Sequence, residues 1–402
     1  MLDVLLLTPW FPNQPDGWPA RFVSDSALAL ASEGHRVRIG VLRGYAPQIL
    51  RELVPPEHRG TIEIHRFERI ESIRERRFLA LPRGLMRKLT NRALDHAVAR
   101  MVASFLSERR PDLVLVHTEG LAPGVVPILR REGLPFVVVL HGRNTNTTYL
   151  TAGEQAERFR VALSAADRLV IVGEPLRAYA EQLSGRIDHV ETVWNGVYPP
   201  ALMREHPVPD IAPVELITVA NLQEGKGVDL LLDALEQLLG QGIDQWSLRI
   251  IGRGPWRDFL EAKAEAAGLA KFVKFMGPRT NSEVFDELMQ SDVFVLPSYR
   301  EAFGVVYLEA MSTGLLTIGV AGEGPSQFID NGMTGFLVEP QSVESIVDIL
   351  RPILLGPRKA WRAIAAAGAQ HARTYCTWQA HAASLTALME RVILRRGQYE
   401  RT

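Results

Sequence analysis

The stretch DVFVLPSYREAFGVVYLEAMSTG, residues 292–314, joins an apolar run to a helix-like apolar segment through a short polar loop. The run 292–298 is apolar on both faces, which is typical of a strand in a parallel sheet. Glu301 and Glu309 stand on either side of Gly304, in the loop and in the segment that follows it. A buried carboxylate needs partners that offset its desolvation. The stretch therefore predicts a strand–loop–helix unit whose carboxylates meet either protein groups or a ligand.

The same alternation recurs along the chain. Strand-like runs lie at 3–9, 36–42, 113–118, 136–142, 169–174, 215–221, 247–254, 273–277, 292–298 and 315–321. Helix-like patterns lie at 21–33, 87–109, 154–166, 228–240, 256–268, 281–290 and 305–313. Apolar strands that alternate with helices indicate parallel sheets covered by helices, the α/β class.

A break in this alternation divides the chain. Residues 198–213 hold five prolines and show no periodicity, as expected of an inter-domain linker. We therefore predict two doubly wound, Rossmann-like domains, residues 1–197 and 214–375, facing a cleft. The tail 376–402 is helical in pattern and can pack on either domain, including a return to the N-terminal one.

Composition excludes several classes of protein. The 402 residues are 47% apolar and 23% charged with a net charge of -1, so no global field favours nucleic acid. The single cysteine, Cys376, excludes an internal disulfide and a cysteine-based zinc site, and it fits a reducing compartment. Residues 1–12 lack a basic region and are interpreted as a first buried strand, not a signal peptide. No apolar stretch approaches the roughly 20 residues of a spanning helix, so we expect a cytoplasmic protein.

Ligands of open α/β sheets bind at the carboxyl ends of the strands, so polar residues placed there are candidates. The backbone N–H groups of Phe303, Gly304 and Val305 would form an anion site at a helix start. The helix would bring Glu309 close to that ligand. The alternative is that Glu309 pairs with a neighbouring arginine and that Glu301 is solvated.

Other candidates follow other strands. Asn221 ends one strand, and Lys226 precedes the helix 228–240, where its charge suits a phosphate; an exposed lysine in a turn is the alternative. Gly252 and Gly254 resemble a nucleotide-binding turn without its third glycine, and a tight βα turn explains them equally well.

Two histidines, His117 and His141, follow strands of the first half. His141 could orient an acceptor or contact a donor sugar. The alternative for both is a structural histidine whose hydrogen bonds are satisfied within the protein.

Taken together, these segments resemble the family 4 retaining glycosyltransferases, which have the two-domain GT-B fold. The resemblance covers nearly the whole chain. It rests on these segments, which follow one another at family-like spacing: TPWFPNQPDGWPARFV (8–23), PDLVLVHTEGLAPG (111–124), VVVLHGRN (137–144), VWNGV (193–197), ANLQEGKGVDLLLDAL (220–235), IIGRGP (250–255), FMGPRTNSEV (275–284), residues 292–314, DNGMTGFLVEP (330–340) and YCTWQAHAASL (375–385).

The resemblance implies a role for each matched residue. Glu301 would bind hydroxyls of the donor sugar, Glu309 the ribose hydroxyls, and Lys226 the diphosphate. Glu301, His141 and Lys226 would form the catalytic group. The expected donor-binding set is Asn221, Lys226, Gly254, Gly277, Pro278, Glu301, Phe303, Gly304, Val305 and Glu309, and the expected acceptor side is Gly17, His117 and His141.

Four positions depart from the family pattern. Asn221 replaces a common arginine, Ala302 a glycine and Gln327 a glutamate. Gly17 stands alone where a double glycine is usual. These departures bear on the choice of donor sugar and on the strength of catalysis.

The implied activity is transfer, with retention, of a hexose-type sugar from a UDP- or GDP-sugar to a hydroxyl of a glycan or lipid-linked acceptor. Such a reaction belongs to cell-surface polysaccharide or glycolipid synthesis, and we expect it to need neither a metal nor another cofactor. The alternatives are a sugar-nucleotide epimerase of the same architecture and a non-catalytic sugar-nucleotide-binding relative.

A basic segment bears on the acceptor. Residues 66–92 hold nine Arg or Lys and three Asp or Glu, interleaved with apolar residues. Such a segment can sit on an anionic membrane surface, which would place the protein on the inner face of the plasma membrane. The alternative is a solvated face over ordinary core residues.

Overall fold

The computed structural model describes residues 1–9, 11, 21–45, 70–79, 99–142, 153–201, 203 and 213–399. The chain forms two compact units. The first unit contains Met1–Val172, Leu176–Trp194 and Trp378–Thr402, and the second contains Gly173–Pro175 and Asn195–Thr377. Gly17, most of the linker 198–213 and most of the segment 66–92 lie outside the described residues.

The first unit is built on a seven-stranded parallel sheet in the order β3-β2-β1-β4-β5-β6-β7. Its strands are β1 (Asp3–Thr8), β2 (Arg36–Tyr45), β3 (Ile70–Leu79), β4 (Leu113–His117), β5 (Phe136–Leu140), β6 (Arg168–Ile171) and β7 (Val190–Thr192). Every residue of β1, β4 and β5 is buried, which explains why these central strands appear in the sequence as unbroken apolar runs.

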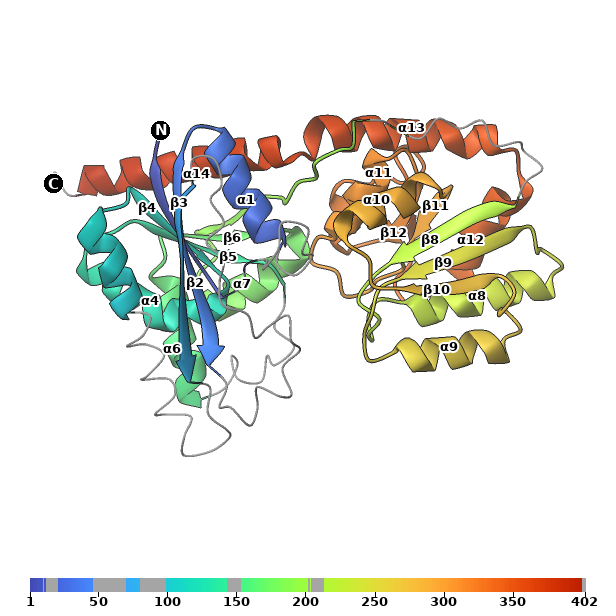
Figure 1. Cartoon of the computed structure of the whole chain (residues 1–402), viewed down its shortest axis with the longest axis horizontal. Helices are drawn as coiled ribbons and strands as arrows, with labels where there is room; N and C mark the ends of the chain where they lie inside the picture. The colour runs from blue at the N-terminus through green and yellow to red at the C-terminus, as the bar shows by residue number, and fades with distance from the viewer. Residues whose placement is uncertain are drawn as a thin grey trace. The chain divides into compact units, whose positions relative to one another are not determined.

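Helices cover the first sheet (Figure 1). They are α1 (Arg21–Ser32), α4 (Ala122–Arg131), α6 (Gly153–Ser164), α7 (Arg177–Ser184) and α14 (Trp378–Tyr399), with the short turns η2 (Glu119–Leu121) and η3 (Glu174–Leu176) and a helical segment at 99–108. Helix α14 packs beside α1. His381 of α14 joins Trp194 O through Nδ1, at 2.6 Å, and Ser26 Oγ through Nε2, at 2.7 Å. The end of the chain is therefore attached to the first unit.

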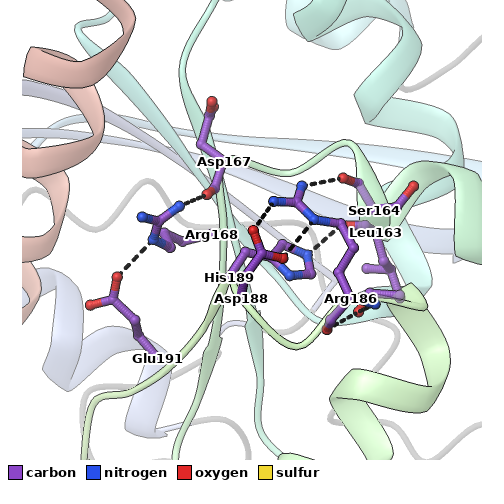
Figure 2. A network of polar contacts seen from close by, with 9 residues as sticks. Leu163, Ser164, Asp167, Arg168, Arg186, Asp188, His189 and Glu191 are labelled. Atoms are coloured by element: carbon purple, nitrogen blue, oxygen red, sulfur yellow. Dashed lines mark hydrogen bonds and ion pairs between the residues drawn. The ribbon is translucent and has the colours of Figure 1, made fainter.

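Charged groups fasten the β6 and β7 edge of this unit (Figure 2). Arg168 Nε donates to Glu191 at 2.7 Å, across the two paired strands. Arg186 donates to Asp188 at 2.9 Å and to the carbonyl of Ser164, at the end of α6, also at 2.9 Å. Several of these groups are partly exposed, so each pair adds little alone, and their shared effect is to fix the loop between α7 and β7.

The second unit has a six-stranded parallel sheet in the order β10-β9-β8-β11-β12-β13. Its strands are β8 (Val214–Val219), β9 (Trp246–Ile251), β10 (Val273–Gly277), β11 (Val293–Val295), β12 (Leu316–Val320) and β13 (Phe336–Val338). Its helices are α8 (Val228–Gly240), α9 (Arg257–Ala266), α10 (Asn281–Met289), α11 (Val305–Ser312), α12 (Val343–Leu355) and α13 (Arg358–Tyr375), with the turn η4 (Gly324–Gln327).

The predicted fold class, two doubly wound α/β domains, is confirmed. The sequence analysis missed three edge strands, since β7 and β13 have three residues each and β3 is rich in charge. Strand β3 uses residues 70–79 of the basic segment, so that part is sheet. Among the described residues, no helix is both long enough and apolar enough to cross a membrane.

A buried ion pair ties the second unit together at the amino ends of its strands. Arg358, which begins α13, lies 3.2 Å from Asp292, and the two side chains are 2% and 0% exposed. Asp292 also accepts the N–H of Glu215 at 3.0 Å, and Arg358 donates to the carbonyl of Pro213 at 2.9 Å. These contacts join α13 to the starts of β8 and β11 on the edge of the sheet opposite the carboxyl ends.

Removing one partner of this pair should be costly. Arg358→Met leaves Asp292 as an uncompensated buried charge, and we expect it to lower the free energy of unfolding by about 3–5 kcal/mol. In Asp292→Asn/Arg358→Met the charge is gone and the bond to Glu215 can remain, so the loss should be smaller. Urea denaturation measures both, and a double variant less stable than Arg358→Met would contradict the assignment.

Candidate functional site

The candidate site begins where the strand order of the second sheet reverses. Strand β9 lies on one side of β8, and β11 lies on the other. The connections after β8 and β11 therefore run to opposite sides, which makes the carboxyl ends of these two strands the switch point of the sheet. Ligands of open α/β sheets bind at such a switch point. Lys226 follows β8 and Glu301 follows β11.

Lys226 and Glu301 form an ion pair at this switch point. Lys226 Nζ lies 2.8 Å from Glu301 Oε2, and the two side chains are 18% and 14% exposed. The loops that carry them are joined by the N–H of Tyr299, which donates to the carbonyl of Gly225 at 2.9 Å. The alternatives of a solvated Glu301 and a simply exposed Lys226 are wrong, because each side chain is largely buried against the other.

The loop of Glu301 is held from its other side by residues that follow β12. The N–H of Glu301 donates to Glu323 at 2.8 Å, and the N–H of Gly324 donates to the carbonyl of Glu301 at 2.9 Å. Gln327, one of the departures from the family pattern, bonds the carbonyl of Gly324 at 3.0 Å. The sequence analysis did not name Glu323 as a site residue, although it lies only four positions before Gln327. These bonds fix the backbone that presents Glu301.

Gly304 starts α11 in a conformation that other residues rarely adopt. Its φ is 83°, and an added Cβ would lie 2.5 Å from the ring of Tyr307. Tyr307 is itself fixed, because its hydroxyl donates to the carbonyl of Leu296 at 2.7 Å. Gly304 occupies the N-cap position and has no side chain that could cap the start of α11. The first turn of α11, which begins with Val305 and follows Phe303, comes after β11 at the carboxyl edge of the sheet, and the first N–H groups of a helix lack partners four residues earlier within it.

Glu309 lies in the second turn of α11 and is half-buried. Its Oε1 accepts a hydrogen bond from Nδ2 of Asn281 at 2.9 Å. Asn281 is the first residue of α10, whose start is fixed by a capping box between Thr280 and Glu283. Asn281 was not predicted, because nothing in the sequence links it to a residue 28 positions away. Its contact orients the carboxylate of Glu309.

The remaining donor-side candidates lie in neighbouring turns. Asn221 is exposed just after β8, Gly277 ends β10, and Pro278 follows it. Gly254 lies after β9, and a Cβ there would be 2.2 Å from the carbonyl oxygen of Leu222. Close packing of two βα turns is thus sufficient to explain Gly254. The turns after β8, β9 and β10 share one edge of the sheet with Lys226.

In the first unit, the structure brings His117 and His141 together. His117 ends β4 and His141 follows the paired strand β5, and His117 Nδ1 lies 2.8 Å from His141 Nε2. Burial is the main cause that lowers the pKa of His117 to about 3, and burial also holds the pKa of His141 well below its usual value. Both rings are therefore neutral at pH 7. Gly17, the third acceptor-side candidate, lies outside the described residues.

Comparisons with known proteins place these features in a family. The family model described as "Glycosyl transferases group 1" matches residues 204–370, and the one described as "Glycosyl transferase 4-like domain" matches residues 19–196. A GDP-mannose-dependent alpha-(1-6)-phosphatidylinositol monomannoside mannosyltransferase of Mycolicibacterium smegmatis is 26% identical over 90% of this chain and 98% of its own length. A glycogen synthase of Mycobacterium tuberculosis is 28% identical over 64% of each chain.

Solved structures show the same fold. A sucrose-phosphate synthase from Thermosynechococcus elongatus superposes with a TM-score of 0.74 at 20% identity, over 98% of this chain and all of that one. The Anabaena protein HepE, in complex with UDP, gives a TM-score of 0.71 at 17% identity, over 97% of this chain and all of that one. At these identities the likeness concerns the fold.

The buried histidines predict a pH dependence of stability. Burial lowers the pKa of His381 to about 4, below the ordinary 6.5 of an unfolded chain. The unfolded state thus binds more protons, and this contribution to stability is lost as the pH falls from 6.5 toward 4. Burial raises the pKa values of Asp25 and Glu119, and these two groups therefore make the protein more stable as the pH falls. A variant is needed to separate the contribution of His381 from theirs.

We expect His381→Gln to reduce the slope of unfolding free energy against pH by about 1.4 kcal/mol per pH unit between pH 6 and 4.5. Urea denaturation at several pH values, with wild type alongside, measures this slope. Parallel curves for the two proteins would show that His381 does not titrate as described.

Proposed function

The chain belongs to the family 4, group 1 type glycosyltransferases of GT-B fold, and on this premise we propose that it transfers a hexose-type sugar from a UDP- or GDP-sugar, with retention, to a hydroxyl of a glycan or lipid-linked acceptor. The observation that carries the proposal is the buried Lys226–Glu301 pair at the switch point of the second sheet. The pair puts a cation and a carboxylate near the start of α11, whose N-cap residue, Gly304, has no side chain. That combination suits a diphosphate attached to a sugar.

Lys226 and the start of α11 would stabilise the leaving group. Departure of a nucleoside diphosphate develops negative charge, which a nearby cation and backbone N–H groups lower in energy. Before a donor binds, Glu301 offsets the cost of burying Lys226. When the donor is bound, the phosphate oxygens would replace Glu301 at Lys226. Glu301 would then accept hydrogen bonds from hydroxyls of the sugar.

Glu309 would bind the ribose. An ionised carboxylate has about four acceptor sites, and the bond that Asn281 Nδ2 donates to Oε1 orients this carboxylate for two vicinal hydroxyls. Asn281 fixes the carboxylate beforehand, which reduces the entropy lost when the donor binds. Gly277 and Pro278, on the neighbouring turn, are assigned to the edge of the base.

The relatives support a nucleotide-sugar donor without deciding its base. The mycolicibacterial relative is GDP-mannose-dependent, whereas the HepE structures contain UDP or UDP-glucose. We assign the acceptor to the first unit, with His117 and His141 on its side of the reaction. We also propose that Lys226 and the helix start supply the positive charge without a metal, so transfer should continue in EDTA.

A lipid-linked acceptor and membrane contact through residues 66–92 remain part of the proposal. Flotation with anionic liposomes at low salt tests this contact. Binding should disappear when Arg74, Arg76, Arg77, Arg87 and Lys88 are changed to Ser. A wild-type protein that does not float would contradict it.

A panel of UDP-, GDP- and ADP-sugars tests the proposed reaction. Slow release of nucleoside diphosphate from one of them, with or without EDTA, is the expected result for a transferase without its acceptor. Isomerisation of the sugar would instead indicate the epimerase. Binding without either reaction would indicate a non-catalytic relative.

With the active donor identified, Glu309→Ala tests the ribose assignment. Hydrogen bonds to a charged group contribute about 1.5–3 kcal/mol, so the donor KM should rise at least about tenfold with a smaller change in kcat. Glu236→Ala, which changes an exposed glutamate of α8 in the same unit, is the matched control. Unchanged kinetics in a folded Glu309→Ala protein would exclude the assignment.

A further inference from the structure

The histidine pair of the first unit has a geometry that determines where its protons lie. The ring centroids of His117 and His141 are 5.0 Å apart, and the ring planes differ by 17°. With Nδ1 and Nε2 only 2.8 Å apart, the rings meet edge to edge and nearly in one plane. That is the arrangement of an N–H···N bond, because the lone pair of the acceptor lies in the ring plane. Phe22 of α1 packs on His141 at 4.3 Å between centroids.

The two outer nitrogens of the pair have no protein partner within the described ranges. They are Nε2 of His117 and Nδ1 of His141, and both atoms are buried. A buried polar atom without a partner costs about 1–3 kcal/mol if it is a donor. Such an atom in a native protein calls for an explanation, and a ligand is one.

Neutral histidines carry one N–H each, so only two arrangements of the protons are available. In one, His117 Nδ1–H donates to His141, and the N–H without a partner is Nδ1–H of His141. In the other, His141 donates, and the N–H without a partner is Nε2–H of His117. The burial that lowers both pKa values makes the neutral forms the relevant ones.

The surroundings of the two rings favour the first arrangement. His117 is 1% exposed, whereas His141 is only half-buried. The Nδ1 atom of His141 is itself buried, but its ring keeps an exposed part, so desolvation of an N–H without a protein partner costs less on His141 than on His117. We propose that His117 donates from Nδ1 to His141 Nε2 and so fixes His141 as the Nδ1–H tautomer, whose N–H is left to bind an oxygen of the acceptor or of the transferred sugar. His117 is then a positioning residue.

The backbone next to His117 is also held in an unusual conformation. Thr118 has a φ of 82°, and its N–H donates to the carbonyl of Val139 on β5 at 2.8 Å. A non-glycine residue in such a region costs on the order of 1–3 kcal/mol, and such residues gather at functional sites. The strained residue fastens the end of β4, with His117, to the strand that carries His141.

A third histidine lies near the pair but does not share its proton. His381 Nδ1 donates to the carbonyl of Trp194, so its Nε2 accepts from Ser26 Oγ. Both of its nitrogens are thereby used within the protein. The tautomer of His141 is therefore set by His117.

The first test is ¹⁵N NMR of the histidine rings in ligand-free protein, with His141→Gln used for assignment. We expect a protonated Nδ1 and an unprotonated, hydrogen-bonded Nε2 for His141. In His117→Phe the bond is lost, and His141 should become a mixture of tautomers. A wild-type His141 protonated at Nε2 would overturn the proposal. This readout does not depend on catalysis, so it stands apart from a failure of the proposed transferase activity.

The second test rests on the proposed function and uses kinetics. His117→Phe should lower kcat/KM for the acceptor at least about tenfold, with donor binding unchanged. His117→Gln, whose amide N–H can donate to His141 Nε2, should recover part of the loss. His189→Gln, at another buried histidine of the first unit, is the control. A changed tautomer with unchanged kcat/KM, or equal losses in the Phe and Gln variants, would contradict a positioning role.

Discussion

The ion pair between Lys226 and Glu301 is the interaction on which the candidate site of the second unit depends. It joins the loops after β8 and β11, the two strands at which the sheet order reverses. It also explains how two charges stand largely buried at the carboxyl edge of an apolar sheet, since each offsets the desolvation of the other. The same loops are held in place by two backbone donors, because the N–H of Glu301 donates to Glu323 and the N–H of Tyr299 donates to the carbonyl of Gly225. A ligand with a diphosphate and sugar hydroxyls offers partners to both members of the pair.

The site of the first unit follows a related principle with neutral groups. His117 and His141 end two neighbouring strands, and burial keeps both rings uncharged. In the first unit a hydrogen bond between His117 and His141 orients a side chain, whereas in the second unit an ion pair does so. In both units, a contact between two side chains fixes groups to which we assign a ligand. The strand ends of the two parallel sheets supply all four residues.

Much of the fold could be predicted from the sequence, because strands buried on both faces are continuous apolar runs. Edge strands could not be predicted, because the sequence of β3, IESIRERRFL, is rich in charge, and β7 and β13 are too short to show a pattern. For the site, the positions of Lys226, Glu301 and Glu309 after strands or in helix starts were predictable. Their partners were not, because the contacts of Lys226 with Glu301 and of Asn281 with Glu309 join residues 75 and 28 positions apart. Such pairings depend on strand order, which local sequence does not encode.

The most direct test of the central pair is calorimetric titration of UDP and GDP into wild type, Lys226→Met and Glu301→Gln. If Lys226 binds the diphosphate and Glu301 competes for it, Lys226→Met should weaken the preferred nucleotide at least about tenfold, or 1.4 kcal/mol. Glu301→Gln should bind it as tightly as wild type or more tightly, because the competing carboxylate is gone. Thermal melting of each variant establishes that it is folded. Equal Kd values for wild type and Lys226→Met, or binding of neither nucleotide by wild type, would contradict the account.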